Sequence, residues 1–113
     1  MTMRIFLPKL TPSLNVSIRE HWSKRRREKH GWVWMLISAV GQDQGPFSRI
    51  GITRVSKGVL DPDNLSGGCK QILDAIRDLG WIADDDAKSV TVEYAQKKPG
   101  ADEDQGMILE FWE

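Results

Sequence analysis

The sequence contains little cysteine and no long hydrophobic run. Its single cysteine, Cys69, excludes an intramolecular disulfide and indicates a reducing compartment. The opening residues, MTMRIFLPKLTPS, include an apolar stretch that is far too short for a signal peptide or a membrane span. We therefore expect a cytoplasmic protein that has no membrane partner.

Internal repeats, low-complexity tracts and linkers are also absent from the chain. Its 113 residues fit one compact domain. A content of 40% apolar and 28% charged residues is typical of an ordinary globular protein and not of a disordered chain. We expect a single domain over residues 1–113.

The net charge is zero, which taken alone argues against a nucleic-acid binder. Divided after Leu60, however, the first part holds 11 Lys and Arg against 3 Asp and Glu, and the second part holds 5 against 13. Net charges of +8 and −8 suit a protein that attracts a polyanion with one surface and holds metal cations with another. Alternatively, the two halves simply attract each other within one domain.

Periodicity and turn residues predict six elements in the order β-α-β-α-β-β. Apolar residues three and four apart, such as Val33, Leu36 and Val40, indicate a helix, whereas β-branched residues and alternation indicate strands. The expected strands cover residues 4–7, 48–60, 90–94 and 107–112, and the expected helices cover residues 17–41 and 64–79. We therefore expect an α/β (α+β) fold in which two main helices cover a small mixed four-stranded sheet.

Two aspartates follow the predicted strand 48–60 and flank Pro62. In an extended segment, residues two apart point to the same side, so Asp61 and Asp63 would project together. Adjacent carboxylates repel each other unless a cation neutralises them, and a hard divalent ion with oxygen ligands does so. The alternative is that both residues only form a turn and cap the next helix, as aspartate often does.

Lys70 extends the candidate site onto the next predicted helix. At about 100° per residue, Asp63, Lys70 and Asp74 fall within roughly 40° of one another, opposite the apolar stripe. A lysine there can clamp a phosphate or stabilise charge that develops in phosphoryl transfer. Lys70 and Asp74 can instead form a plain i, i+4 surface pair. The apolar stripe consists of Leu65, Cys69, Ile72, Leu73 and Ile76.

Three more aspartates, residues 84–86, follow this helix after a turn at Gly80. A following strand that pairs beside the first can place them close to Asp61 and Asp63. The commoner fate of such an acidic run is a solvated turn.

A run of cations lies near the start of the first predicted helix, among several tryptophans. Four adjacent cations cover every side of a helix at an electrostatic cost, which favours contact with DNA phosphates. The aromatic residues can stack on unpaired bases, although for Trp32 and Trp34 we expect a place in the core or against a dimer partner. The cations are Lys24, Arg25, Arg26 and Arg27.

The pattern D-x-D-N-L, a lysine on the following helix, L-D-A-I and then G-W-I-A-D-D resembles the RusA family of Holliday junction resolvases. F-L-P followed by T-P-S-L-N, and the closing G-M-I-L-E-F, are also similar to that family, so the resemblance covers nearly the whole chain. It implies a compact α/β fold, a homodimer, and Mg²⁺-dependent nicking of opposed strands at a four-way DNA junction. One departure is the interval between Asn64 and Lys70, which is about one helical turn longer than in the family.

Position by position, the resemblance implies that Asp61, Asp63 and Asp85 are the catalytic carboxylates and Mg²⁺ ligands, with Lys70 as the essential lysine. Asp84 replaces Asp85 if the register shifts by one. The expected function is that of a structure-selective DNA endonuclease in recombination and repair. Two alternatives stay open: a catalytically inactive DNA-binding accessory protein, and a metal-dependent nuclease that acts on other branched nucleic acids.

Overall fold

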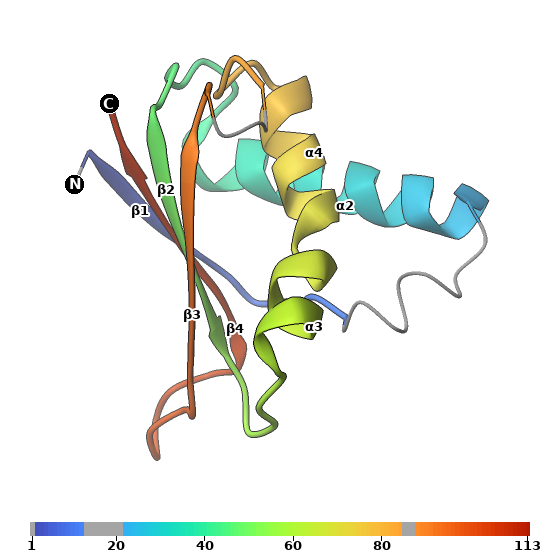
Figure 1. Ribbon diagram of the computed structural model, residues 1–113, viewed down its shortest axis with the longest axis vertical. Coiled ribbons are helices and arrows are strands. Elements are labelled where there is room, and N and C mark those ends of the chain that lie inside the picture. The colour runs from blue at the N-terminus through green and yellow to red at the C-terminus, as the bar shows by residue number, and fades with distance from the viewer. Residues whose placement is uncertain (1, 13–21, 85–87) are drawn as a thin grey trace.

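The computed structural model describes residues 2–12, 22–84 and 88–113. Along the described chain the strands and helices follow the order β-α-β-α-α-β-β (Figure 1). The elements are β1 (Met3–Leu7), α2 (Trp22–Val40), β2 (Arg49–Val55), α3 (Pro62–Gly68), α4 (Lys70–Asp78), β3 (Thr91–Lys97) and β4 (Gly106–Trp112). The predicted α/β class with a four-stranded mixed sheet is therefore confirmed.

The sheet has the strand order β1-β4-β2-β3. β4 pairs antiparallel with both β1 and β2, whereas β2 and β3 are parallel. Arg49 lies opposite Thr91 where these two strands begin, and Val55 lies opposite Lys97 where they end. Two parallel strands need a crossover connection, and α3 and α4 provide it. The chain therefore returns to the end of the sheet where β2 begins before it enters β3.

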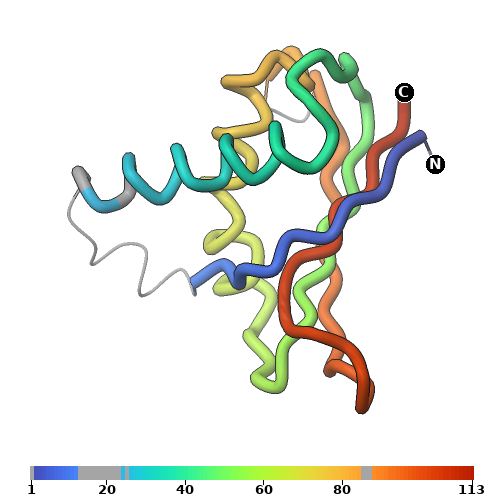
Figure 2. The backbone as a smooth tube through the Cα atoms, turned by 180° about the vertical axis from the view of Figure 1, so that it is seen from behind, coloured from blue at the N-terminus to red at the C-terminus, as the bar shows by residue number. Residues whose placement is uncertain are grey.

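Within the described residues, α2, α3 and α4 lie on one face of the sheet and leave its other face uncovered (Figures 1 and 2). Alternate strand residues such as Ile5, Ile52 and Leu109 point toward the helices, because side chains in a strand alternate between its two faces. The predicted apolar stripe of the crossover helix is confirmed as buried. Its residues are Leu65, Cys69, Ile72, Leu73 and Ile76.

The single helix predicted for residues 64–79 is wrong in two respects. It begins earlier, at Pro62, because Asp61 caps it and proline suits the first helical position. It also divides at Cys69, whose N–H bonds to the carbonyl groups of Ser66 and Gly67 in a tighter turn. Two adjacent glycines, Gly67 and Gly68, precede the break, and glycine pairs weaken a helix where it kinks.

The predicted strand 48–60 is also too long, since β2 ends at Val55. The residues that follow bond to other partners: the Ser56 N–H donates to the Lys97 carbonyl at 3.0 Å and the Lys57 N–H to Gln105 Oε1 at 3.0 Å. Among the described residues, none of the helices combines the length and the apolar content that crossing a membrane requires.

Candidate functional site

Asp61 immediately precedes α3 and caps it. Its Oδ1 accepts a hydrogen bond from the Asn64 N–H at 2.9 Å, and its Oδ2 accepts one from Asn64 Nδ2 at 2.8 Å. The capping role that the sequence left open is therefore present. Each oxygen of an ionised carboxylate can accept two hydrogen bonds, so these contacts leave Asp61 with further acceptor capacity toward solvent.

Asp63 lies in the first turn of α3 and not in an extended segment. The prediction that Asp61 and Asp63 project together from an extended segment is therefore wrong, because the helix starts at Pro62. Both carboxylates nevertheless lie exposed at the same end of α3. Their shared place at this end of the helix follows from where α3 starts and not from the strand.

The hydrogen bond from the Asn64 N–H, followed by the one from the Asn64 side-chain amide, lowers the pKa of the Asp61 carboxyl below its ordinary value. Both bonds favour the ionised form. Asp61 therefore stays negatively charged at neutral pH. This is the state that a metal ligand requires.

The lowered pKa of Asp61 gives a testable pH dependence of stability. A group whose pKa falls on folding contributes stability that is present above its unfolded pKa and lost as pH falls through its folded pKa. Asp61→Asn keeps a good capping residue with no titration. Thermal unfolding from about pH 5 to about pH 2 should therefore show the wild type losing stability relative to Asp61→Asn. A constant difference over that range would contradict the capping account.

The chemistry of Asp61 and Asp63 fits Mg²⁺. This ion takes oxygen ligands, keeps several waters, and is often bound through only one or two carboxylates together with substrate phosphates. The described part of the chain contains no group of three or more His, Cys, Asp or Glu side chains that could hold a metal ion. The described residues thus offer a carboxylate pair and not a complete protein cage.

The pair lies at the carboxyl end of the parallel strands β2 and β3, the edge where open α/β sheets bind ligands. Gln96, near the end of β3, hydrogen-bonds both the N–H and the C=O of Leu60. A hollow of about 540 Å³ separates this part of β3 from α3. Its lining residues are Pro62, Asp63, Leu65, Ser66, Tyr94, Ala95 and Gln96.

Sequence reasoning missed Gln96 and Tyr94. Val92, Tyr94 and Gln96 alternate along β3 on the side that faces the helices, and each is half-buried. A glutamine at the end of such an alternating series was the available signal. A polar side chain on a core-facing position needs hydrogen-bond partners.

Asp84 lies far from this carboxylate pair. It is 4.0 Å from Arg77 near the end of α4, and the Trp81 carbonyl accepts a 2.7 Å hydrogen bond from Phe47, just before β2 begins. The seven residues of β2, at roughly 3.3 Å each, place the beginning and the end of the strand about 20 Å apart. The expectation that the next strand returns this acidic run to Asp61 fails for Asp84, because β3 is parallel to β2. Asp85 itself lies outside the described residues.

Lys70 opens α4 and is well exposed, with 70% of its side chain accessible. Its Nζ lies 3.7 Å from Asp74 Oδ1, so the i, i+4 pair that the sequence left open is present. Asp74 also lies 3.6 Å from Arg77. Lys70 thus points toward the later part of α4, away from Asp61. Its role as an essential lysine stays a prediction.

The chain matches no known family model, curated protein or solved structure. The resemblance to the RusA resolvases accordingly stays an expectation drawn from the motifs.

The basic run lies in the first turns of α2. Lys24, Arg26 and Arg27 are exposed there, and the Arg25 side chain lies outside the described part of the chain. Farther along α2, Lys29 bonds to Asp78 of α4 at 2.9 Å and so fixes the two helices to each other. The run is therefore a cationic surface carried on a helix that is docked to the fold.

The tryptophans near the basic run differ in burial. Trp32 is fully buried, with Lys9 Nζ 4.8 Å above its ring, which confirms its expected place in the core. Trp34 is 67% exposed and so does not belong to the core.

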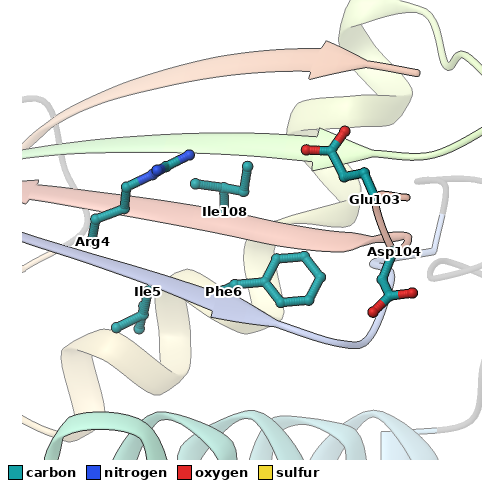
Figure 3. Close-up of a pocket in the computed structure, with 6 residues that line it drawn as sticks. All are labelled: Arg4, Ile5, Phe6, Glu103, Asp104 and Ile108. Carbon is teal, nitrogen blue, oxygen red and sulfur yellow. The ribbon is translucent and has the colours of Figure 1, made fainter. Parts of the chain in front are cut away.

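A second hollow, of about 380 Å³, lies over β1 and the first part of β4 (Figure 3). Arg4 and Phe6 of β1, Ile108 of β4, and Glu103 and Asp104 of the preceding loop form its walls. Hydrogen bonds from Lys97 and the Gly100 N–H lower the pKa of Glu103, which they hold in place. None of the predicted site residues that the structure describes lines this hollow, and Glu103 serves to shape the loop.

Proposed function

We propose that the chain is a Mg²⁺-dependent, structure-selective DNA endonuclease that resolves Holliday junctions by paired nicking. The observation that carries the proposal is the exposed carboxylate pair Asp61 and Asp63 at the carboxyl end of the parallel strands. The D-x-D-N-L resemblance supplies the reaction class and the substrate.

In this proposal Asp61 and Asp63 hold Mg²⁺ through carboxylate oxygens. An ion held there would supply an activated water and stabilise charge on the leaving oxygen. Asn64 keeps Asp61 ionised and oriented through its two hydrogen bonds. Lys70 is assigned to steady the scissile phosphate, which requires it to leave Asp74.

The basic run of α2 is the proposed DNA-binding surface. DNA phosphates would be contacted by Lys24, Arg25, Arg26 and Arg27. These contacts release counterions from the DNA, so the binding affinity should fall as the salt concentration rises. A structure-selective enzyme reads the shape of the branched DNA through such backbone contacts and not through base edges. The run needs no residue from the carboxylate pair, so binding and cleavage should be separable by mutation.

A homodimer completes the proposed site. Asp84 lies near the beginning of β2, whereas Asp61 and Asp63 lie beyond its end. We therefore assign the third carboxylate to a second copy of the chain. Asp85 of the partner subunit would then join Asp61 and Asp63. A two-fold dimer would form two such sites, one for each strand that is cut.

Mixing two inactive variants tests this arrangement. A heterodimer of Asp61→Asn and Asp85→Asn chains keeps one intact site if Asp85 acts on the partner, and none if it acts on its own chain. Co-refolding equal amounts should restore roughly a quarter of the wild-type junction-nicking rate, since half of the dimers are mixed and each has one working site. No recovery after verified subunit exchange would place Asp85 in its own chain's site.

One observation favours a second candidate, an inactive DNA-binding accessory protein. Both oxygens of Asp61 already accept hydrogen bonds from Asn64, as a purely structural cap would. The two candidates share junction binding in EDTA and differ on addition of Mg²⁺. Nicks that appear only with Mg²⁺ support the endonuclease, and bound but intact junctions support the accessory protein.

A further inference from the structure

We propose that Gln96 is a positioning residue for Asp61, an inference that rests on the proposed metal site. Gln96 is the penultimate residue of β3 and is half-buried on the side that faces the helices. Its Oε1 accepts a hydrogen bond from the Leu60 N–H at 3.0 Å, and its Nε2 donates one to the Leu60 C=O. Leu60 directly precedes Asp61.

Both hydrogen bonds of the Gln96 side chain reach Leu60, so they act at one point of the chain. The Leu60 N–H belongs to the peptide plane before Leu60, and its C=O belongs to the plane that joins Leu60 to Asp61. Holding both planes fixes the Asp61 N–Cα bond, and the φ of −68° that Asp61 adopts as the cap of α3 then sets the direction of its Cα–Cβ bond. Gln96 therefore acts on the orientation of a proposed ligand without touching the metal.

The position of Gln96 in the sheet explains why such a contact is needed. The pairing of β2 with β3 ends at Val55 and Lys97, and the Ser56 N–H adds one last bond to the Lys97 carbonyl at 3.0 Å. The chain then leaves the sheet for α3. The side-chain amide of Gln96 imitates a peptide group and attaches the end of this connection to β3 again, immediately before the carboxylate pair.

Gln105 offers a matched control within the same connection. Its Oε1 accepts hydrogen bonds from Ser56 Oγ at 3.3 Å and from the Lys57 N–H at 3.0 Å. It thus makes two hydrogen bonds to the connection, as Gln96 does, but to residues that lie farther from Asp61. Replacing either glutamine by methionine removes two hydrogen bonds while keeping the length of the side chain.

The test measures Mn²⁺ binding to the full chain by titration calorimetry, with Gln96→Met and Gln105→Met beside the wild type. We expect Gln96→Met to weaken Mn²⁺ binding about tenfold, the lower end for loss of a contact that orients a metal ligand. Gln105→Met should remain within about twofold of wild type. In cleavage assays, Gln96→Met should need about tenfold more Mg²⁺ while kcat at saturating Mg²⁺ changes little.

Wild-type Mn²⁺ affinity in Gln96→Met, or an equal loss in both variants, overturns the positioning role and leaves the metal site standing. A wild type whose Mn²⁺ binding is absent or insensitive to Asp61→Asn overturns the site itself, and the positioning role with it. Circular dichroism establishes that each variant is folded at the titration temperature. If Gln96→Met does not fold, Gln96→Leu removes the same two hydrogen bonds with a side chain of different shape. The same tenfold loss of Mn²⁺ affinity is then expected of Gln96→Leu, and wild-type affinity would overturn the positioning role.

Discussion

Asp63→Asn is expected to lower the rate of junction cleavage by about 1,000-fold or more. A metal-activated hydrolysis draws several kcal/mol of transition-state stabilisation from the ion, and each 1.36 kcal/mol changes the rate tenfold. Asp63 is exposed in the first turn of α3, so the amide should leave the fold intact. Junction binding in EDTA should be retained or become tighter, because one negative charge near the DNA is lost.

Asp43→Asn is the matched control for Asp63→Asn. Asp43 is also exposed, but it follows α2 in the turn where Gln42 accepts a hydrogen bond from Trp81, near the end of α4. Its substitution should leave the cleavage rate within about twofold, since surface changes away from special contacts have small effects. Equal rates for Asp63→Asn and the wild type would contradict the assignment of the metal site.

Trp81→Ala is expected to destabilise the fold by about 3–5 kcal/mol, a large share of the roughly 5–15 kcal/mol that stabilises a domain. Trp81 is fully buried, and its ring meets Phe111 edge to face at a centroid distance of 5.7 Å. Its Nε1 donates a 2.8 Å hydrogen bond to the Gln42 carbonyl. Alanine would leave a cavity and remove that bond. Urea unfolding followed by circular dichroism measures the change in the free energy of unfolding.

Trp34→Ala provides the comparison for Trp81→Ala. The Trp34 side chain is 67% exposed on α2, so its removal should change the free energy of unfolding of the monomer by no more than about 0.5 kcal/mol. A loss of stability at Trp34 as large as the loss at Trp81, and dependent on protein concentration, would indicate that Trp34 is buried against a second copy of the chain.

Local pattern was enough to predict the class of the fold. The stripe from Leu65 to Ile76 is buried because residues three and four apart share one side of a helix, a property that short segments carry by themselves. The break at Cys69 was harder to predict from the sequence, since two glycines in a helix indicate a weak point but do not show that the helix divides there.

The candidate site was harder to predict because it depends on contacts between distant segments. The position of Asp84 is set by the parallel pairing of β2 and β3, which no local spacing encodes. The two hydrogen bonds between Gln96 and Leu60 join residues that lie 36 positions apart in the sequence. Asp61 was ambiguous for another reason: aspartate is both a favoured capping residue and a metal ligand, and only the contacts with Asn64 establish the capping role.

The central claim is that this chain cuts branched DNA with a metal held by Asp61 and Asp63. Its most direct test is the initial rate of strand nicking on a mobile four-way junction and on a linear duplex of the same sequence, in Mg²⁺ and at one salt concentration. The account predicts paired nicks in opposed strands of the junction, little cutting of the duplex, and no nicks in EDTA. An intact junction in Mg²⁺ at protein concentrations that bind it fully would contradict the claim.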